Sequence, residues 1–203
     1  MIYDFIYLLL LLSGIVVLVE NRLKRIVFFL SIQGLLLVIP VYQTHEEDKI
    51  HATSLIVMVL IFKAILTPLI LRWAAEKSKM NESTIPRFGY LATMFFLILG
   101  LVLAVKITEG LNEQSIPIHK IGLIYVILMV YVGILCFVVR KNWIALIAGF
   151  CVFENGIFVL TLVLDKGLPF GLEFGSFIDA VLVIVSGGIL QLSPHMHTKE
   201  RKI

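Results

Sequence analysis

Apolar runs long enough to cross a lipid bilayer recur along this chain, and short polar breaks separate them. An α-helix rises about 1.5 Å per residue, so roughly 20 residues span a hydrocarbon core of about 30 Å. About seven runs approach this length, which predicts an all-α, polytopic membrane protein with residues 1–203 in a single membrane domain. The expected helices cover residues 2–19, 26–42, 52–71, 89–105, 121–139, 144–164 and 172–190.

The composition supports this architecture. The chain is 60% hydrophobic and 15% charged, whereas soluble domains carry about 25% charged residues. One compact core could not bury so many apolar side chains, so lipid must solvate the remainder. The first apolar run lacks both a basic leader and a small-residue cleavage site, so we expect it to remain as a spanning helix. The net charge of +3 comes from basic residues in short loops rather than on one face, which argues against nucleic-acid binding.

The distribution of lysine and arginine among the loops predicts the orientation in the membrane, because these residues are enriched in cytoplasmic loops. Most of them follow the first, third and fifth expected helices or lie in the C-terminal tail. This arrangement predicts an N-terminus outside the cell and a C-terminus in the cytoplasm. The basic residues on the expected cytoplasmic side are Arg22, Lys24, Arg25, Arg72, Lys77, Lys79, Arg87, Arg140, Lys141, Lys199, Arg201 and Lys202, against Lys49, Lys106, Lys120 and Lys166 on the other.

A weak internal repeat divides the chain. Asn21 lies in a charged loop and Gln33, followed by a glycine, lies twelve residues later in a helix. Asn142 and Glu154, the latter followed by Asn-Gly, repeat this spacing in the second half. Both loops begin on the same side of the membrane, so the pattern predicts a parallel duplication of a three-helix unit, a device known from transporters. The predicted units are residues 1–71 and 121–190, with 89–105 as a linking helix.

Three ionisable residues fall deep inside expected helices, at least seven residues from the first residue of each, namely Lys63, Glu154 and Asp179. A charged side chain at the centre of a membrane helix costs roughly 2.5–3.5 kcal/mol on insertion scales. These groups must therefore face protein or water, pair with one another, or be neutral. Groups that exchange protons at mid-membrane depth are what a proton relay requires, so Lys63, Glu154 and Asp179 are the relay candidates.

Gln33, Asn155 and Glu173 are secondary candidates. A structural interpretation stands beside the functional one for all of these residues: a buried lysine–carboxylate pair can hold helices together, Gln33 can form an interhelical hydrogen bond, and Glu173 can lie at the interface. Pro68 removes a backbone hydrogen bond five residues after Lys63, so we expect a kink and a local break near that lysine.

Segment 151–156 reads Cys-Val-Phe-Glu-Asn-Gly and follows a basic turn, segment 177–180 reads Phe-Ile-Asp-Ala, and segment 62–70 places a proline five residues after its lysine. Together these segments resemble component E of hydrogenase-4. The last three expected helices in turn resemble the K subunit of respiratory complex I and the C subunit of Mrp-type antiporters, in which a mid-helix carboxylate follows a basic loop. In the N-terminal copy Gln33 replaces that carboxylate, and an amide cannot take up and release a proton.

The resemblance implies a non-catalytic membrane-arm subunit of a group 4 nickel–iron hydrogenase or formate hydrogenlyase-type complex, in a prokaryotic inner (plasma) membrane. Its partners would be lipid and large antiporter-like subunits, and it would contribute to coupled translocation of protons or sodium. We expect no active site, metal or cofactor in this chain, since two cysteines inside apolar helices cannot supply the ligands of an iron–sulfur cluster. Two alternatives stay open: a structural spacer of the same complex, and an independent small transporter.

Overall fold

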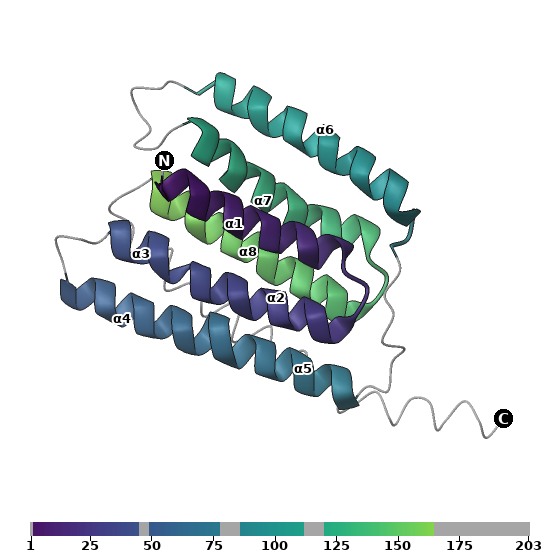
Figure 1. The fold of residues 1–203 in the computed structure, drawn as a ribbon, viewed down its shortest axis with the longest axis horizontal. Coiled ribbons are helices and arrows are strands. Elements are labelled where there is room, and N and C mark those ends of the chain that lie inside the picture. The colour runs from purple at the N-terminus through teal and green to yellow at the C-terminus, as the bar shows by residue number, and fades with distance from the viewer. Residues whose placement is uncertain (1, 45–48, 78–85, 112–119, 165–203) are drawn as a thin grey trace.

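The computed structural model describes residues 2–44, 49–77, 86–111 and 120–164, which form a bundle of helices (Figure 1). Within these residues the structure has α-helices and one π-helical segment, η1, and no strand. The elements are α1 (Ile2–Val19), α2 (Leu23–Leu36), α3 (Val38–Thr44), α4 (Lys49–Val59), η1 (Leu60–Leu66), α5 (Thr67–Lys77), α6 (Gly89–Glu109), α7 (Lys120–Val139) and α8 (Trp143–Leu164).

The described helices confirm an all-α protein with several segments that can cross a membrane. Five spans are long and apolar enough, and α1 is a shorter apolar helix beside them. The expected helix over 172–190 lies outside the described residues, so the total of about seven remains a prediction. The five spans are Leu23–Gln43, Thr53–Glu76, Gly89–Glu109, Lys120–Val139 and Ile144–Leu164.

Two of the expected helices contain an interruption, and each interruption lies just before a proline. Proline has no backbone N–H, and its ring clashes with the carbonyl group four residues earlier. Pro40 disturbs the turn at Leu36, where α2 ends and α3 follows after one residue. Pro68 acts in the same way on Ala64, inside η1. The distortion expected near Lys63 therefore takes the form of a π-helical turn, which a Thr67 N–H to Phe62 carbonyl hydrogen bond closes.

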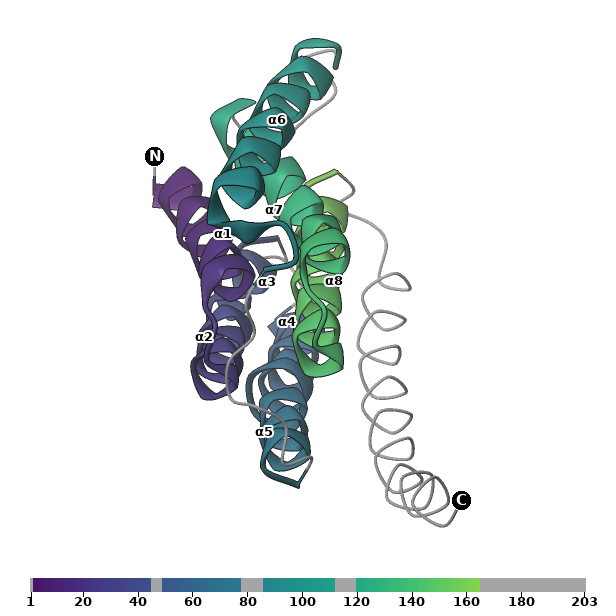
Figure 2. The same cartoon turned by 90° about the vertical axis from the view of Figure 1, so that its right-hand side faces the viewer.

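The helices pack in an order that differs from their order in the chain. The α7–α8 hairpin lies at the centre, with α1 against α7 and α2 against α1 (Figure 1). The segment α4–η1–α5 packs on α2 along one edge, and α6 covers α7 along the other (Figure 2). Small residues permit the closest approach: a Cβ on Gly133 would lie 2.4 Å from the Cα of Phe153. The α7–α8 hairpin is therefore a closely packed core, with the α4–η1–α5 segment on one side of the bundle and α6 on the other.

The polar turns gather the basic residues at one end of the bundle. The α1–α2 turn, the end of α5, the start of α6 and the α7–α8 turn all lie there (Figure 1). A hydrogen bond of 2.7 Å from the Arg87 N–H to the Val139 carbonyl joins two of these segments. We call this the basic end, and among the described residues it carries Arg22, Lys24, Arg25, Arg72, Arg87, Arg140 and Lys141.

Candidate functional site

Four buried polar side chains from three different spans form a connected hydrogen-bond network. The Lys63 ammonium donates to Oε1 of Glu154 at 2.9 Å and to Oδ1 of Asn155 at 3.0 Å. The Asn155 amide donates to Oε1 of Gln33 at 3.0 Å. The Gln33 amide in turn donates to the carbonyl of Leu10 in α1, at 3.3 Å. We call Lys63, Glu154, Asn155 and Gln33 the buried polar cluster.

The two charged side chains of the buried polar cluster are almost fully buried inside this chain. The side chain of Lys63 is 1% exposed and that of Glu154 is 9% exposed. The Lys63 ammonium also lies 5.4 Å from the ring centroid of Phe158, a distance at which an aromatic face attracts a cation. A lone charge in such a place would be strongly unfavourable, so these two groups are tolerated because each has the other and Asn155 as partners.

The geometry of the pair suits proton exchange. Nζ of Lys63 and Oε1 of Glu154 share one hydrogen bond, so an ammonium–carboxylate pair and a neutral amine–carboxylic acid pair differ only in the position of one proton along it. Both forms have zero net charge, which matters in a medium of low dielectric constant. A proton can therefore move within the pair without a change in its net charge. Gln33 cannot join in this chemistry, because its amide has no proton to exchange at physiological pH.

The π-helical turn sets the position of Lys63, and α2 supports that turn. Pro68 leaves the carbonyl of Ala64 without its usual helical N–H donor, and the Ser31 hydroxyl donates to that carbonyl at 2.6 Å. Gly34 brings the two main chains together, because a Cβ there would lie only 2.7 Å from the Ala64 Cα and N. A short stretch of α2 therefore supplies a hydrogen-bond donor to the carbonyl of the irregular turn, and it also places Gln33 beside that turn.

Local interactions at the start of α8 and along α7 fix the position of Glu154. Oδ1 of Asn142 accepts a hydrogen bond from the Ile144 N–H at 2.9 Å, as a helix N-cap does. Further along, a Cβ on Gly156 would lie 2.9 Å from the backbone N of Val130. The close contact with α7 leaves the carboxylate of Glu154 facing η1. The loop asparagine singled out by the sequence repeat is thus a capping residue.

Arg140 performs a structural task that sequence reasoning missed, having counted it only as a basic loop residue. Its guanidinium is buried and its Nη2 donates to the carbonyls of Val17, Leu18 and Glu20 at 3.2, 2.5 and 2.6 Å. These carbonyls form the negative end of the α1 dipole, where a cation is favourable. Burial lowers the pKa of Arg140, while the nearby carboxylate of Glu20 acts in the opposite direction. The α7–α8 turn is thereby fastened to the end of α1.

The structure brings four of the six candidate residues together and leaves two undescribed. Lys63 and Glu154 form an ion pair, and the secondary candidates Asn155 and Gln33 extend it. Asp179 and Glu173 lie outside the described residues. The interhelical hydrogen bond expected for Gln33 is present. Ser31 was not identified from the sequence, although the proline four residues after Ala64 is a signal that this carbonyl needs another donor.

The two cysteines lie where the hydropathy pattern placed them. Cys136 in α7 and Cys151 in α8 are both buried and both free thiols. Each lies among apolar side chains of the core. In the part of the chain that the structure describes, no three histidine, cysteine, aspartate or glutamate residues lie close enough to hold a metal ion.

Comparison with known proteins finds distant relatives. An uncharacterized protein of Mycobacterium tuberculosis is 25% identical over 187 residues, which cover 89% of this chain and 83% of that protein. Hydrogenase-4 component E of Escherichia coli K12 is 26% identical over 125 residues, and the component E of Shigella flexneri matches to the same extent. Those 125 residues are 62% of this chain and 58% of component E, so the match covers less than two thirds of either protein. No family model matches the chain, and no solved structure matches it significantly.

Proposed function

We propose that this chain is a non-catalytic membrane-arm subunit of a hydrogenase-type, complex-I-related complex, in which the buried polar cluster forms one segment of a path for protons. Two findings support the first half of this proposal: the five apolar spans, and the distant similarity to hydrogenase-4 component E. Such a subunit would lie in the inner membrane of a prokaryotic cell beside large antiporter-like subunits. Its basic end would face the cytoplasm, with the N-terminus outside.

The buried ion pair between Lys63 and Glu154 is the observation that carries the second half. The pair lies well inside its spans, ten residues from the first residue of each of Thr53–Glu76 and Ile144–Leu164. Replacement of a buried ion pair by apolar residues of similar volume is often neutral or even stabilising. Stability alone therefore gives little reason to keep two charges at this depth. A role in moving charge does give one.

The proposed step follows from the hydrogen-bond geometry. A proton delivered to the Glu154 carboxylate would neutralise it and weaken its attraction for the Lys63 ammonium. Asn155 would still hold that ammonium through Oδ1 while it passes a proton to the next acceptor. Asp179 is the residue that we propose to exchange charge with the pair. Because Gln33 cannot titrate, the path would continue sideways into neighbouring subunits.

The test is Glu154→Gln in the assembled complex, with ion translocation coupled to turnover measured in membrane vesicles. We expect the complex to assemble and its electron transfer to continue, while translocation of protons or sodium falls at least tenfold. Glu154→Asp, which keeps a titratable carboxyl, should retain part of the activity. Glu109→Gln is the matched control, because that glutamate is exposed and its ion-pair partner among the described residues is Lys106 in the same helix. Full translocation in the Glu154→Gln complex would refute the relay.

A spacer function is the second candidate, and a specific observation favours it. The pair ties α8 to η1, and the Asn155–Gln33 hydrogen bond ties α8 to α2, so the cluster fixes the order of the helices. In this case Glu154→Gln would reduce the amount of assembled complex, and whatever assembles would translocate ions at the normal ratio to turnover. The two candidates therefore predict different ratios of ions translocated to turnovers, and the same vesicles measure this ratio.

The predicted duplication is part of the proposal as well. The α1–α2 hairpin would be the first two helices of one three-helix unit, and the α7–α8 hairpin would be the equivalent two helices of the other. Gln33 and Asn155 come from these two hairpins and contact each other at 3.0 Å. In this view the site lies at the interface of the repeats, which is where transporters built from repeats place theirs.

A further inference from the structure

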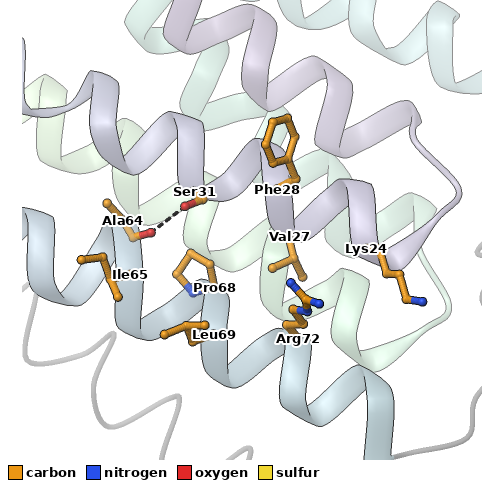
Figure 3. Close-up of a pocket in the computed structure, with 9 residues that line it drawn as sticks. All are labelled: Lys24, Val27, Phe28, Ser31, Ala64, Ile65, Pro68, Leu69 and Arg72. Carbon is orange, nitrogen blue, oxygen red and sulfur yellow. Dashed lines mark hydrogen bonds between the residues drawn. The ribbon is translucent and has the colours of Figure 1, made fainter.

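A cavity of about 310 Å³ opens on the outer side of the bundle, between α2 and the η1–α5 segment (Figure 3). It is separate from the buried polar cluster, and nothing in the proton path uses it. Its volume is at the lower limit of the roughly 300–1,000 Å³ typical of sites for small molecules. That size fits the phosphate of a larger amphipathic molecule together with the first part of one hydrocarbon chain.

The cavity has a charged mouth and apolar walls. Lys24 and Arg72 lie at the mouth, on α2 and α5, and Val27 and Pro68 line the cavity further in (Figure 3). The Nε of Arg72 donates to Glu76 at 3.0 Å, and its guanidinium carries four other N–H donors. The mouth therefore has two basic side chains, of which Arg72 is paired with Glu76. A phosphodiester has one negative charge and several oxygens that accept hydrogen bonds from ammonium and guanidinium groups.

The distances along the helices match the layers of a bilayer. Lys24 and Ser31 are seven residues apart in α2, which is about 10 Å along a helix. The mouth belongs to the basic end, whereas the floor reaches the Ser31–Ala64 hydrogen bond behind the π-helical turn (Figure 3). A phospholipid has the same order, with its phosphate in the interfacial layer and its chains in the hydrocarbon core. Basic pockets between membrane helices are a recurrent way to hold such headgroups.

The cavity also faces outward, as a lipid site must. Phe28, Ile65 and Leu69 at its rim are 61%, 54% and 56% exposed. In a membrane these side chains contact hydrocarbon, so a lipid can enter laterally without opening the bundle. A soluble anion would meet the charged mouth but would gain nothing from the apolar walls below it.

We propose that this cavity binds an anionic phospholipid, with its phosphate between Lys24 and Arg72 and one acyl chain along Pro68 and Leu69. Each basic residue near an anionic membrane surface contributes about 1 kcal/mol, or roughly a fivefold change in affinity. Two of them should therefore favour phosphatidylglycerol over phosphatidylcholine with the same chains by roughly 30-fold.

The experiment uses the full chain in its membrane complex and a phosphatidylglycerol probe with a photoreactive group on one acyl chain. We expect crosslinks to map to segments 24–31 and 64–72. The double variant Lys24→Gln/Arg72→Gln should reduce labelling at least tenfold, and Leu69→Trp, which fills the chain path from an exposed position, should reduce it as well. Arg87→Gln/Lys141→Gln removes the same charge from the same end and should leave labelling unchanged.

Several outcomes would overturn the proposal. Equal labelling by the phosphatidylcholine analogue would show that the charges do not select the lipid. Competition by millimolar inorganic phosphate would show that the site takes a free anion. Labelling of the isolated chain but not of the complex would show that another subunit covers the cavity. None of these outcomes depends on ion translocation, so the result is independent of the relay test.

Discussion

Removing Lys63 alone, and then together with its partner, gives the sharpest test of the buried ion pair. Lys63→Met keeps an unbranched side chain of similar length but deletes the ammonium, and with it the contact with the Phe158 ring. Glu154 then has a buried charge without Lys63, or must bind a proton. For a carboxyl of ordinary pKa near 4.3, binding a proton at pH 7 costs about 4 kcal/mol. Measured losses for such truncations are about 3–5 kcal/mol.

The double variant Lys63→Met/Glu154→Met should be far more stable than the sum of the single variants. Each single change should cost about 3–5 kcal/mol, so independent effects would add up to about 8 kcal/mol. We expect the double variant to lose only about 1–2 kcal/mol, because no buried charge remains, although Oδ1 of Asn155 loses its donor from Lys63. The coupling energy should therefore be several kcal/mol.

Unfolding of the purified chain by sodium dodecyl sulfate in mixed micelles, followed by circular dichroism, measures these differences. Lys106→Met provides the control, since Lys106 and Glu109 form an exposed pair at 3.2 Å. That change should lie within about 0.5 kcal/mol of the unaltered chain. If the double variant loses as much as the two single variants together, the pair is not coupled and the reasoning is wrong.

Three further variants test how the site is supported, and the same unfolding assay reports all of them. Gly34→Ala should lose about 1–3 kcal/mol, because its Cβ would lie 2.7 Å from the main chain of Ala64. Ser31→Ala should lose about 1–3 kcal/mol by leaving that carbonyl without the hydroxyl; Pro68→Ala in the same chain should restore part of the loss, since residue 68 then has an N–H to donate. Arg140→Gln should lose about 3 kcal/mol, because the end of α1 loses a charged donor to three carbonyls.

Each of these three predictions has a control variant or a result that would contradict it. Gly110→Ala should be nearly neutral, since nothing lies closer than 3.5 Å to its Cβ position. A Ser31→Ala loss that Pro68→Ala does not reduce would show that the hydroxyl acts elsewhere. For Arg140, equal stability of the Gln variant would mean that the three hydrogen bonds contribute nothing beyond those to water.

The sequence predicted several membrane spans and the burial of Lys63 and Glu154 within them, because both depend on hydropathy. A charge within an apolar run is visible in any sequence, and Lys63 and Glu154 were selected on that ground. Which carboxylate pairs with Lys63 depends on the order in which helices pack, and hydropathy does not encode that order. Asp179 lies outside the described residues, so its place in the proposed relay remains a prediction.

The supporting residues were harder to predict because they look ordinary. Ser31 lies in a helix next to an apolar run, and its partner is a main-chain carbonyl 33 residues away. Arg140 resembles any basic residue at a membrane edge, and only the three-dimensional arrangement turns it toward the end of α1. Pro40 and Pro68 do mark the two interruptions, but a proline predicts only that a helix is disturbed. Whether the result is a break or a π-helical turn depends on the hydrogen-bond donors and the space that the neighbouring helix provides.

The separation of Lys63 and Glu154 has a consequence for how the protein is made. The two residues are 91 positions apart in the chain. At about 5–20 residues per second, the ribosome reaches Glu154 roughly 5–20 s after Lys63. During this interval the lysine has neither Glu154 nor Asn155, although Gln33 and Ser31 are already present. Until the α7–α8 hairpin is inserted, the first half of the protein therefore has to stay at the insertion machinery, keep Lys63 near the membrane surface, or hold it as a neutral amine.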